Sequence, residues 1–419
     1  MQAADLSPVP VEGRTQSGWD LFLLFAAANI VATTLQVGAS LGAGLPLTRM
    51  WLAVGTGSVL GAALVAALAP VGSRLGVPSM IAIRAALGHT GARLVAVVLF
   101  VTNFAWIAVN NAIAASVAAR MLPLPLDERA WAIGVGLVST VVVAGGPAAV
   151  RRADRWAVPL MAAAGLAVTW VVLRLAPAAP APAIPAVLDG SASLPRLFDI
   201  VVGYQVSWLL MFADYSRFTA RARTSAWAVF LGLGLTALWL MPVGWHLARH
   251  AGSEDPGTML AAADAGMAAA ALITLATVTT NFVNIYLSSL AWRSVVPAVS
   301  DRTAIWMVGL IGTALGLSGG WLDRFAGFMT VVGSVLVPVG GVLIAHFVLR
   351  PRPTDIAALY DPRGPLSGIR WPGLLAWVAG VAAYYATAVG ATVSGLAVAV
   401  GAYLLLASRT PAPGTGRIR

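Results

Sequence analysis

Two asparagines and a tryptophan share one face of an apolar stretch of the sequence. Asn103, Trp106 and Asn110 lie within residues 92–119 at spacings of three and four, which places them on the same side of an α-helix. An indole can stack on a planar ring, and amides offer both donors and acceptors to its polar edge. The pattern predicts a site for an uncharged, planar heterocycle. The alternative role for such side chains is hydrogen bonding between membrane helices.

A second apolar stretch, residues 263–292, carries the adjacent hydroxyls of Thr279 and Thr280. Hydroxyl and carbonyl oxygens suit a hard cation. No Asp, Glu or His falls in the middle of an apolar stretch that also carries the amides, and a proton-coupled carrier usually needs a buried titratable group there. The hydroxyl pair therefore favours Na⁺ over H⁺ as a coupling ion.

The composition indicates that a membrane surrounds these side chains. Of 419 residues, 59% are hydrophobic and 10% are charged, whereas soluble domains carry about 25% charged residues. One transmembrane helix takes about 20 apolar residues, and we count twelve apolar runs. These runs centre near residues 20–45, 50–73, 92–119, 130–149, 154–177, 197–217, 225–248, 263–292, 303–320, 325–349, 371–388 and 390–408. We predict an all-α integral membrane protein with twelve transmembrane helices, and we exclude soluble enzymes and nucleic-acid binders.

Loops rich in Pro and Gly divide the chain into segments. We expect a cytoplasmic tail, a first repeat of helices 1–5, a Pro/Ala-rich external loop, a second repeat of helices 6–10, a cytoplasmic loop, helices 11 and 12, and a second cytoplasmic tail. In the same order, their boundaries are 1–18, 19–177, 178–195, 196–349, 350–370, 371–408 and 409–419.

The distribution of arginines predicts the orientation. With the N-terminus inside, nineteen of the 26 basic residues, all of them Arg, fall on the cytoplasmic side, as the positive-inside rule requires. No basic segment with a following cleavage site opens the chain, so we expect no signal peptide. We expect a multi-pass monomer of the inner (plasma) membrane, in contact with lipid, with both termini cytoplasmic.

A tripeptide recurs between the two halves of the sequence. Thr102-Asn103-Phe104 lies in the third run and Thr280-Asn281-Phe282 in the eighth, five helices later. Inverted repeats with a site between broken helices are one recurring transporter plan. The Gly-rich segment 38–44 in the first run and Gly203 in the sixth stand where such breaks are expected.

Four short motifs, taken in order, resemble the nucleobase–cation symporter-1 family, which contains purine-cytosine permeases, hydantoin transporters, and uracil and allantoin permeases. The resemblance extends from about Gly18 to the last helix and implies a LeuT-like five-plus-five inverted repeat followed by two C-terminal helices. The motifs are Gly38-Ala-Ser-Leu-Gly-Ala-Gly44, Ala105-Trp106, Asp214-Tyr-Ser-Arg217-Phe218 and Thr279-Thr280-Asn281.

The same resemblance implies which residues bind substrate. The family's second aromatic position holds Gln205, which is a departure, so a neighbouring aromatic residue would have to supply that ring. The implied substrate-binding residues are Trp106, which stacks on the base, with Asn103, Asn110, Tyr204, Gln205, Trp208 and Asn281. The implied Na⁺ ligands are carbonyls and hydroxyls of Ala27, Ile30, Ala276, Thr279 and Thr280.

We therefore predict a secondary active transporter that imports a pyrimidine-type nucleobase by cation symport, with Na⁺ as the coupling ion and no other cofactor. Cytosine is one candidate substrate. Hydroxymethylpyrimidine is another, because residues 207–218 and 277–280 resemble transporters proposed for it. The alternative is a proton-coupled or passive permease of a purine, allantoin or hydantoin. The Asp and His residues form no paired catalytic motif, which argues against an enzyme.

Overall fold

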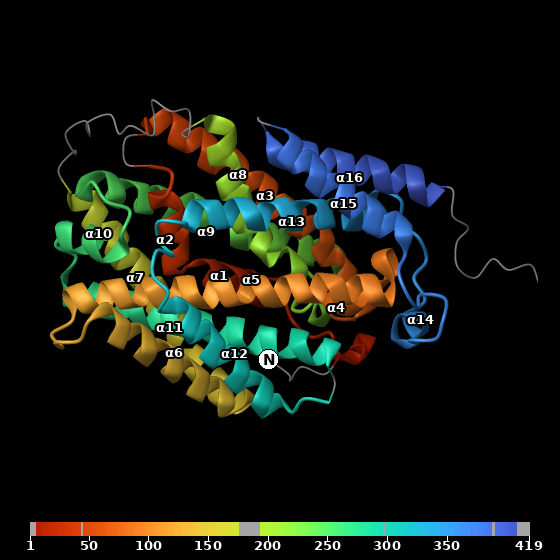
Figure 1. Ribbon diagram of the computed structural model, residues 1–419, viewed down its shortest axis with the longest axis horizontal. Coiled ribbons are helices and arrows are strands. Elements are labelled where there is room, and N and C mark those ends of the chain that lie inside the picture. The colour runs from red at the N-terminus through yellow and green to blue at the C-terminus, as the bar shows by residue number, and fades with distance from the viewer. Residues whose placement is uncertain (1–5, 43–44, 176–192, 297, 388–389, 409–419) are drawn as a thin grey trace, which may run out of the picture.

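Helices make up nearly all of the ordered structure (Figure 1). The computed structural model describes residues 6–42, 45–175, 193–296, 298–387 and 390–408. Within this part of the chain, extended pairing is limited to isolated bridges of Thr15 and Gln16 with Thr219. Most of the expected external loop and the expected C-terminal tail lie outside the described residues.

Every expected apolar run contains helix. The first five runs form α1 (Gly18–Asn29) with α2 (Ala32–Ala39), α3 (Leu47–Leu75), α5 (Arg84–Met121), α6 (Glu128–Ala144) and α7 (Pro147–Arg174). The next five form α8 (Leu194–Gln205) with the 3-10 helix η3 (Val206–Met211), α9 (Ala222–Ala251), α11 (Gly266–Val295), α12 (Asp301–Gly316), and α13 (Phe325–Ile344) with the π-helical η5 (Ala345–Leu349). The last two form α15 (Trp371–Ala386) and α16 (Ala391–Ser408). The short helix η1 (Val11–Gly13) precedes α1, and four others connect the runs: α4 (Ser79–Ala82), η4 (Ser216–Phe218), α10 (Pro256–Ala262) and α14 (Ile356–Tyr360).

Helix length and composition identify a multi-pass membrane protein. In the described part of the chain, six helices are long and apolar enough to cross a bilayer, and the bent pair α1–α2 would make a seventh. Other runs give shorter helices, such as α12 and α15 with 16 residues each, whereas a span needs about 20. Helix length therefore does not establish the expected number of twelve.

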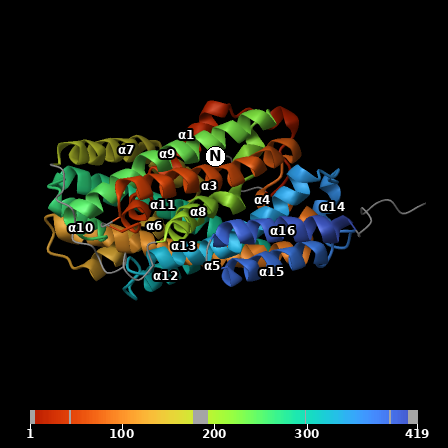
Figure 2. The same ribbon diagram turned by 90° about the horizontal axis from the view of Figure 1, so that it is seen from above.

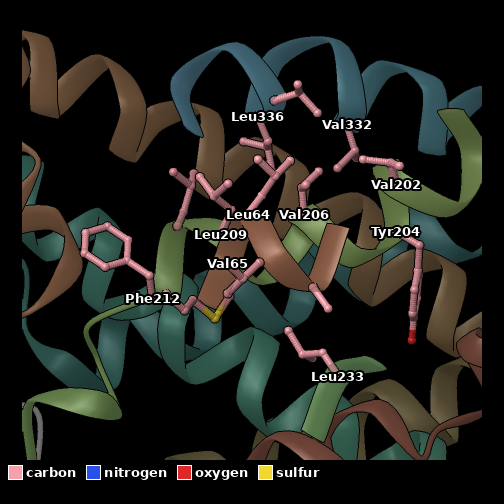
Figure 3. Packing of buried hydrophobic residues seen from close by; sticks show 14 of the residues in the cluster. Leu64, Val65, Val202, Tyr204, Val206, Leu209, Phe212, Leu233, Val332 and Leu336 are labelled. Carbon is pink, nitrogen blue, oxygen red and sulfur yellow. The ribbon is translucent and has the colours of Figure 1, made fainter. Parts of the chain in front are cut away.

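The helices pack in two groups. One contains α1, α2, α3, α8 and α9, with α3 against α9; the other contains α5, α6, α11 and α12, with α5 against α11 and α6 against α12. The pair α15–α16 packs beside α13 at one edge, and α10 and α14 lie at opposite ends of the long axis (Figures 1 and 2). Interior aliphatic residues from α3, α8, η3, α9 and α13 interlock between the elements (Figure 3).

Both ends of the described chain lie at the α14 end of the molecule. The Tyr360 hydroxyl of α14 donates to the carbonyl of Leu6. Arg352, just before α14, donates to the carbonyl of Ala407 in the last turn of α16 at 2.8 Å.

The helices of the first and sixth runs are interrupted, but neither interruption falls at the expected glycines. α1 and α2 meet at 56° across Ile30 and Val31, β-branched residues that fit a helix poorly. α8 changes to 3-10 geometry after Gln205, two residues beyond Gly203.

The expectation that glycines mark the breaks is therefore wrong for residues 38–42 and for Gly203, and residues 43–44 are outside the described chain. Close packing explains the glycines instead. A Cβ on Gly38 would lie 1.8 Å from the carbonyl oxygen of Met241, and one on Gly203 would lie 2.2 Å from that of Met329.

Candidate substrate and cation site

A cavity of about 660 Å³ lies among α1, α2, α5, α7, α8, η3 and α11, within the usual range for a small-molecule pocket. Exposed Asp20 and Leu23, near the start of α1, form part of its rim. Asp20 is the charged residue among the described lining residues. The remaining wall consists of amides, hydroxyls, aromatic rings and aliphatic side chains, which suits an uncharged ligand.

Asn110 presents an unpaired amide to this cavity. Its side chain is only 1% exposed, and neither Oδ1 nor Nδ2 has a hydrogen-bond partner in the described chain. The Nδ2 group of Asn103, 2% exposed, is also without a partner there. Because buried polar groups are almost always hydrogen-bonded, unpaired amide atoms on residues that line the cavity are candidate partners for a ligand bound there.

Trp106 lies between these two asparagines and is held by surrounding rings. Tyr204, Phe325 and Phe328 meet its indole edge-on, at centroid distances of 5.8, 6.3 and 5.1 Å. Such edge-to-face contacts are favourable and restrict the indole orientation. Trp208 also lines the cavity, from η3, with its ring edge-on to Phe25.

Three oxygens of the expected cation site come together on α11. The hydroxyls of Thr279 and Thr280 both donate to the carbonyl of Ala276, at 2.8 and 2.9 Å. The Thr279 hydroxyl also lies 3.6 Å from Sδ of Met161. A hydroxyl whose single proton is donated in this way can still offer its oxygen lone pairs to a cation.

The expected α1 ligands lie close by. Ala27 lines the same cavity as the two threonines. Ile30 and Ala276 line a small adjoining cavity of about 20 Å³, where Met161 of α7 packs between the α1 break and α11. No group of three His, Cys, Asp or Glu side chains able to hold a metal occurs in the described residues. The donors are neutral oxygens, which fits a monovalent hard cation better than a transition metal.

Two of the residues predicted to bind substrate do not line the cavity. Gln205 is fully buried, donates to the carbonyl of Leu233 at 3.2 Å and accepts from Asn29 at 3.5 Å. Asn281 is also fully buried and donates to Oδ1 of Asn111 at 2.8 Å. In this structure both amides connect helices.

Sequence reasoning missed four polar residues of the wall, namely Thr33, Ser207, Tyr215 and Asn284. Helical periodicity contained the signal for the last of these. Asn284 is four residues after Thr280 and therefore on the same helix face, whereas Asn281 is rotated away by about 100°.

A second cavity, of about 700 Å³, lies at the α10 end of the molecule. Its wall carries charged side chains of both signs, and three of them form ion pairs. Arg120 contacts Glu128 at 3.6 Å and Asp255 at 3.1 Å. Asp255 also accepts from the Ser116 hydroxyl at 2.6 Å and from Thr258, whose backbone and hydroxyl lie at 2.8 and 2.7 Å.

The electrostatics of Asp255 reflect these contacts. Burial alone would raise the pKa of its carboxyl, but the hydrogen bonds and Arg120 hold that pKa below its usual value. The ion pairs and hydrogen bonds of Asp255 in the second cavity thus connect α10 to α5. In the amide-lined cavity, by contrast, the amides of Asn103 and Asn110 have atoms without a hydrogen-bond partner in the described chain.

Comparison with known families gives one match that covers almost the whole chain. Residues 8–407 match the family described as permease for cytosine/purines, uracil, thiamine and allantoin.

Two relatives are similar over nearly their full length. The cytosine permease of Escherichia coli K12 is 27% identical over 90% of this chain and 87% of its own. The putative purine-cytosine permease YxlA of Bacillus subtilis is 25% identical over 88% of this chain and 84% of its own.

Among solved structures, Mhp1, a nucleobase-cation-symport-1 family transporter, has the same fold. Its inward-facing conformation superimposes with a TM-score of 0.81 at 18% identity, covering 98% of this chain and 95% of Mhp1. Its closed conformation with bound bromovinylhydantoin gives 0.79 at 16% identity, covering 97% and 95%.

Proposed function

The chain belongs to the family of permeases for cytosine/purines, uracil, thiamine and allantoin, the nucleobase–cation symporter-1 family, and on that premise we propose that it imports a pyrimidine-type base by Na⁺ symport. Members of this family are permeases and not enzymes. The base would bind in the amide-lined cavity, and the free energy of the Na⁺ gradient would drive its accumulation.

The observation that carries this proposal is the unpaired amide of Asn110 beside Trp106. A pyrimidine base is planar, uncharged and has donors and acceptors around its edge, so it can stack on the indole while Asn103 and Asn110 bind that edge. Tyr204 and Trp208 would complete the aromatic part of the site. A charged substrate would find no counter-charge deep in the described wall.

The proposed Na⁺ ligands are the carbonyls of Ala27, Ile30 and Ala276 and the hydroxyls of Thr279 and Thr280. A bound Na⁺ would draw the α1 break and α11 together. No Asp, Glu or His among the described lining residues lies deep in the cavity, since Asp20 is at the rim. The buried carboxylate of Asp199 lies elsewhere and accepts from the backbone of Thr392 at 3.0 Å. These facts favour Na⁺ over H⁺.

We propose the LeuT-like arrangement of two five-helix repeats and two added helices for this chain, with twelve spans. The two most extensive helix contacts join helices that are five runs apart, namely α3 with α9 and α5 with α11, and α6 also packs against α12, five runs later. With the arginine-rich α14 end in the cytoplasm, both termini are cytoplasmic and the amide-lined cavity opens inward, as import by alternating access requires of one state.

Cytosine is the first substrate to test, because a relative with that specificity covers most of the chain. Hydroxymethylpyrimidine is the second, on the sequence resemblance described above. Uptake of labelled cytosine in cells that lack their own cytosine permease, competed with unlabelled hydroxymethylpyrimidine, uracil, hypoxanthine and allantoin, ranks the substrates. Lack of competition by every pyrimidine would contradict the proposed substrate class.

The coupling ion is tested in the same assay by replacing sodium with choline, with an uncoupler added in parallel. We expect uptake to require sodium and to tolerate the uncoupler over the first seconds. Thr280→Ala should raise the half-saturating Na⁺ concentration, because it removes one oxygen ligand. Uptake that is complete in choline and abolished by the uncoupler would identify H⁺, and not Na⁺, as the coupling ion.

A further inference from the structure

Tyr204 and Thr34 form a directed chain of hydroxyl groups next to the amide-lined cavity. The two hydroxyl oxygens are 2.6 Å apart, and the Thr34 hydroxyl donates to the carbonyl of Asn29. A threonine hydroxyl has one proton, so Tyr204 must be the donor to Thr34. Consecutive bonds of this kind polarise and strengthen one another at low dielectric.

The chain ends on the peptide group at the helix break. Asn29 is the last residue of α1, and its carbonyl accepts from the Thr34 side chain. The N–H of the same peptide, on Ile30, donates to the carbonyls of Ala26 and Ala27, at 2.9 and 3.2 Å. Because a peptide group is planar, the bond from Thr34 also sets the direction of the Ile30 N–H, and with it the carbonyl of Ala27.

The opposite end of the chain touches the proposed stacking residue. The Tyr204 ring meets the Trp106 indole edge-on at 5.8 Å. Figure 3 shows Tyr204 extending away from the aliphatic side chains, with its hydroxyl at the far end. The ring of Tyr204 therefore lies against Trp106, and its hydroxyl lies at the start of α2.

The Asn29 side chain is held mainly by α9, with a longer contact of 3.5 Å from its Nδ2 to Oε1 of Gln205 on α8. Its Nδ2 donates to the carbonyl of Leu233 and to the Thr236 hydroxyl of α9, at 3.1 and 3.0 Å. With the side chain anchored on α9, the backbone at the break is left to respond to Thr34.

We propose that Tyr204 and Thr34 are positioning residues that couple the base to the cation: they transmit the position of the Trp106–Tyr204 pair to the peptide between Asn29 and Ile30, and so to the carbonyls of Ala27 and Ile30. The inference rests on the proposed function, since it takes those carbonyls as cation ligands. It adds a route by which base and Na⁺ favour each other's binding.

Thr34→Val is the informative variant. Valine keeps the β-branched shape of this fully buried side chain and removes both hydrogen bonds, and Thr34 is not among the lining residues of the cavity. Tyr204→Phe removes the same bond from the other side, together with the longer 3.3 Å contact between the Tyr204 and Thr33 hydroxyls. Thr140→Val is the matched control, because Thr140 is equally buried and its hydroxyl bonds to Gly136 of its own helix.

The measurement is the dissociation constant of tritiated cytosine for the purified full chain, with saturating Na⁺ and with choline. The ratio of the two constants is the coupling factor, and it applies to both ligands reciprocally. We expect this factor to fall at least about threefold, or roughly 0.6 kcal/mol, in Thr34→Val. We expect a similar fall in Tyr204→Phe, no further fall in the double variant, and the wild-type factor in Thr140→Val.

The outcomes separate this inference from the proposed function. A wild-type factor of one would refute Na⁺ coupling, and this inference with it. A wild-type factor well above one that persists in a thermally stable Thr34→Val protein would overturn the hydroxyl chain alone. Independent, additive losses in the two single variants would also contradict it, because members of one chain must act as a unit.

Discussion

Individual asparagines of this protein take two different roles, and burial by itself does not distinguish them. Asn110 and Asn281 are both almost fully buried. Asn281 donates to Asn111 on a neighbouring helix, whereas neither amide atom of Asn110 has a partner in the described chain. Under the proposed function, we therefore expect Asn110 to recognise the base and Asn281 to hold α11 against α5.

Substitution of each asparagine by leucine tests this assignment. Asn110→Leu should leave a polar edge of the base unpaired, at about 1–3 kcal/mol, so affinity should fall about five- to 150-fold and the order of preference among bases should change. Asn281→Leu should lower the melting temperature and leave that order intact. Competition binding with cytosine and uracil measures both, and altered preference in Asn281→Leu alone would reverse the two roles.

Trp106 offers a second test at the residue scale. Base–aromatic stacking is worth about 1–3 kcal/mol, so Trp106→Ala should weaken base binding about tenfold or more. Trp106→Phe keeps an aromatic face and should retain part of the affinity. Size-exclusion profiles show whether the three surrounding rings still hold the fold. Equal affinities in all three proteins would remove Trp106 from the site.

Among the elements, α10 is a short helix whose place depends on one carboxylate. Asp255 caps α10 through Thr258 and joins it to α5 through Ser116 and Arg120. Asp127 caps α6 in the same way, but the bond described for it is the local one from Ala130 at 2.8 Å. Both aspartates cap a helix, but they differ in tertiary contacts. Asp127 is therefore a matched control for the tertiary role of Asp255.

Asp255→Ala should destabilise the protein more than Asp127→Ala. Loss of a helix cap lowers the free energy of unfolding by about 0.5–2 kcal/mol. In Asp255→Ala the Ser116 hydroxyl and the Arg120 guanidinium also lose a partner, which lowers it further. Thermal unfolding measured by fluorescence compares the two variants with wild type. A larger loss in Asp127→Ala would refute the tertiary role of Asp255.

The same contacts set a pH dependence. Because the folded pKa of Asp255 is held below its ordinary value, its stabilisation is present above the unfolded pKa, about 3.9, and is lost as the pH falls through the folded pKa. The difference in melting temperature between wild type and Asp255→Ala should persist at neutral pH and shrink below about pH 4. A difference independent of pH would remove the carboxylate charge from the explanation.

The whole molecule has a cavity toward each end, and they differ in chemistry. The amide-lined cavity reaches Asp20 and Leu23, and the charged cavity lies beside α10. They approach each other along α5, where Asn110 lines one and Ala112 lines the other. A carrier that alternates access would be in its inward-open state here, with the α10 contacts closing the outer side.

Single cysteines can test this orientation, because the sequence contains none. An impermeant maleimide should label Leu23→Cys from the cytoplasmic side only and Ser318→Cys, at the charged cavity, from the outer side only. Right-side-out and inside-out vesicles provide the two exposures. Labelling from the opposite sides would invert the proposed topology, while transport by both variants would confirm that they fold.

The sequence by itself determined that this is a helical membrane protein with one Trp–amide face and one hydroxyl pair. Those conclusions follow from composition and from helical periodicity, which need only local spacing. They identified Asn103, Trp106, Asn110, Thr279 and Thr280, all of which line the cavity.

Tertiary structure alone decided which neighbouring residues turn toward the cavity and where the helices break. Tyr204 lines the cavity and Gln205 does not, and Thr280 lines it while Asn281 does not. Successive helical residues point about 100° apart, and packing against α5, α9 and α13 sets the rotation of each helix. The α1–α2 break likewise falls at Ile30 and Val31, where Thr34 supplies the hydrogen bond to Asn29 that a continuing helix would have made. No local pattern of glycines encodes this replacement of a main-chain hydrogen bond by the Thr34 side chain. The Thr34 hydroxyl is itself bonded to Tyr204, which is 170 residues away along the chain.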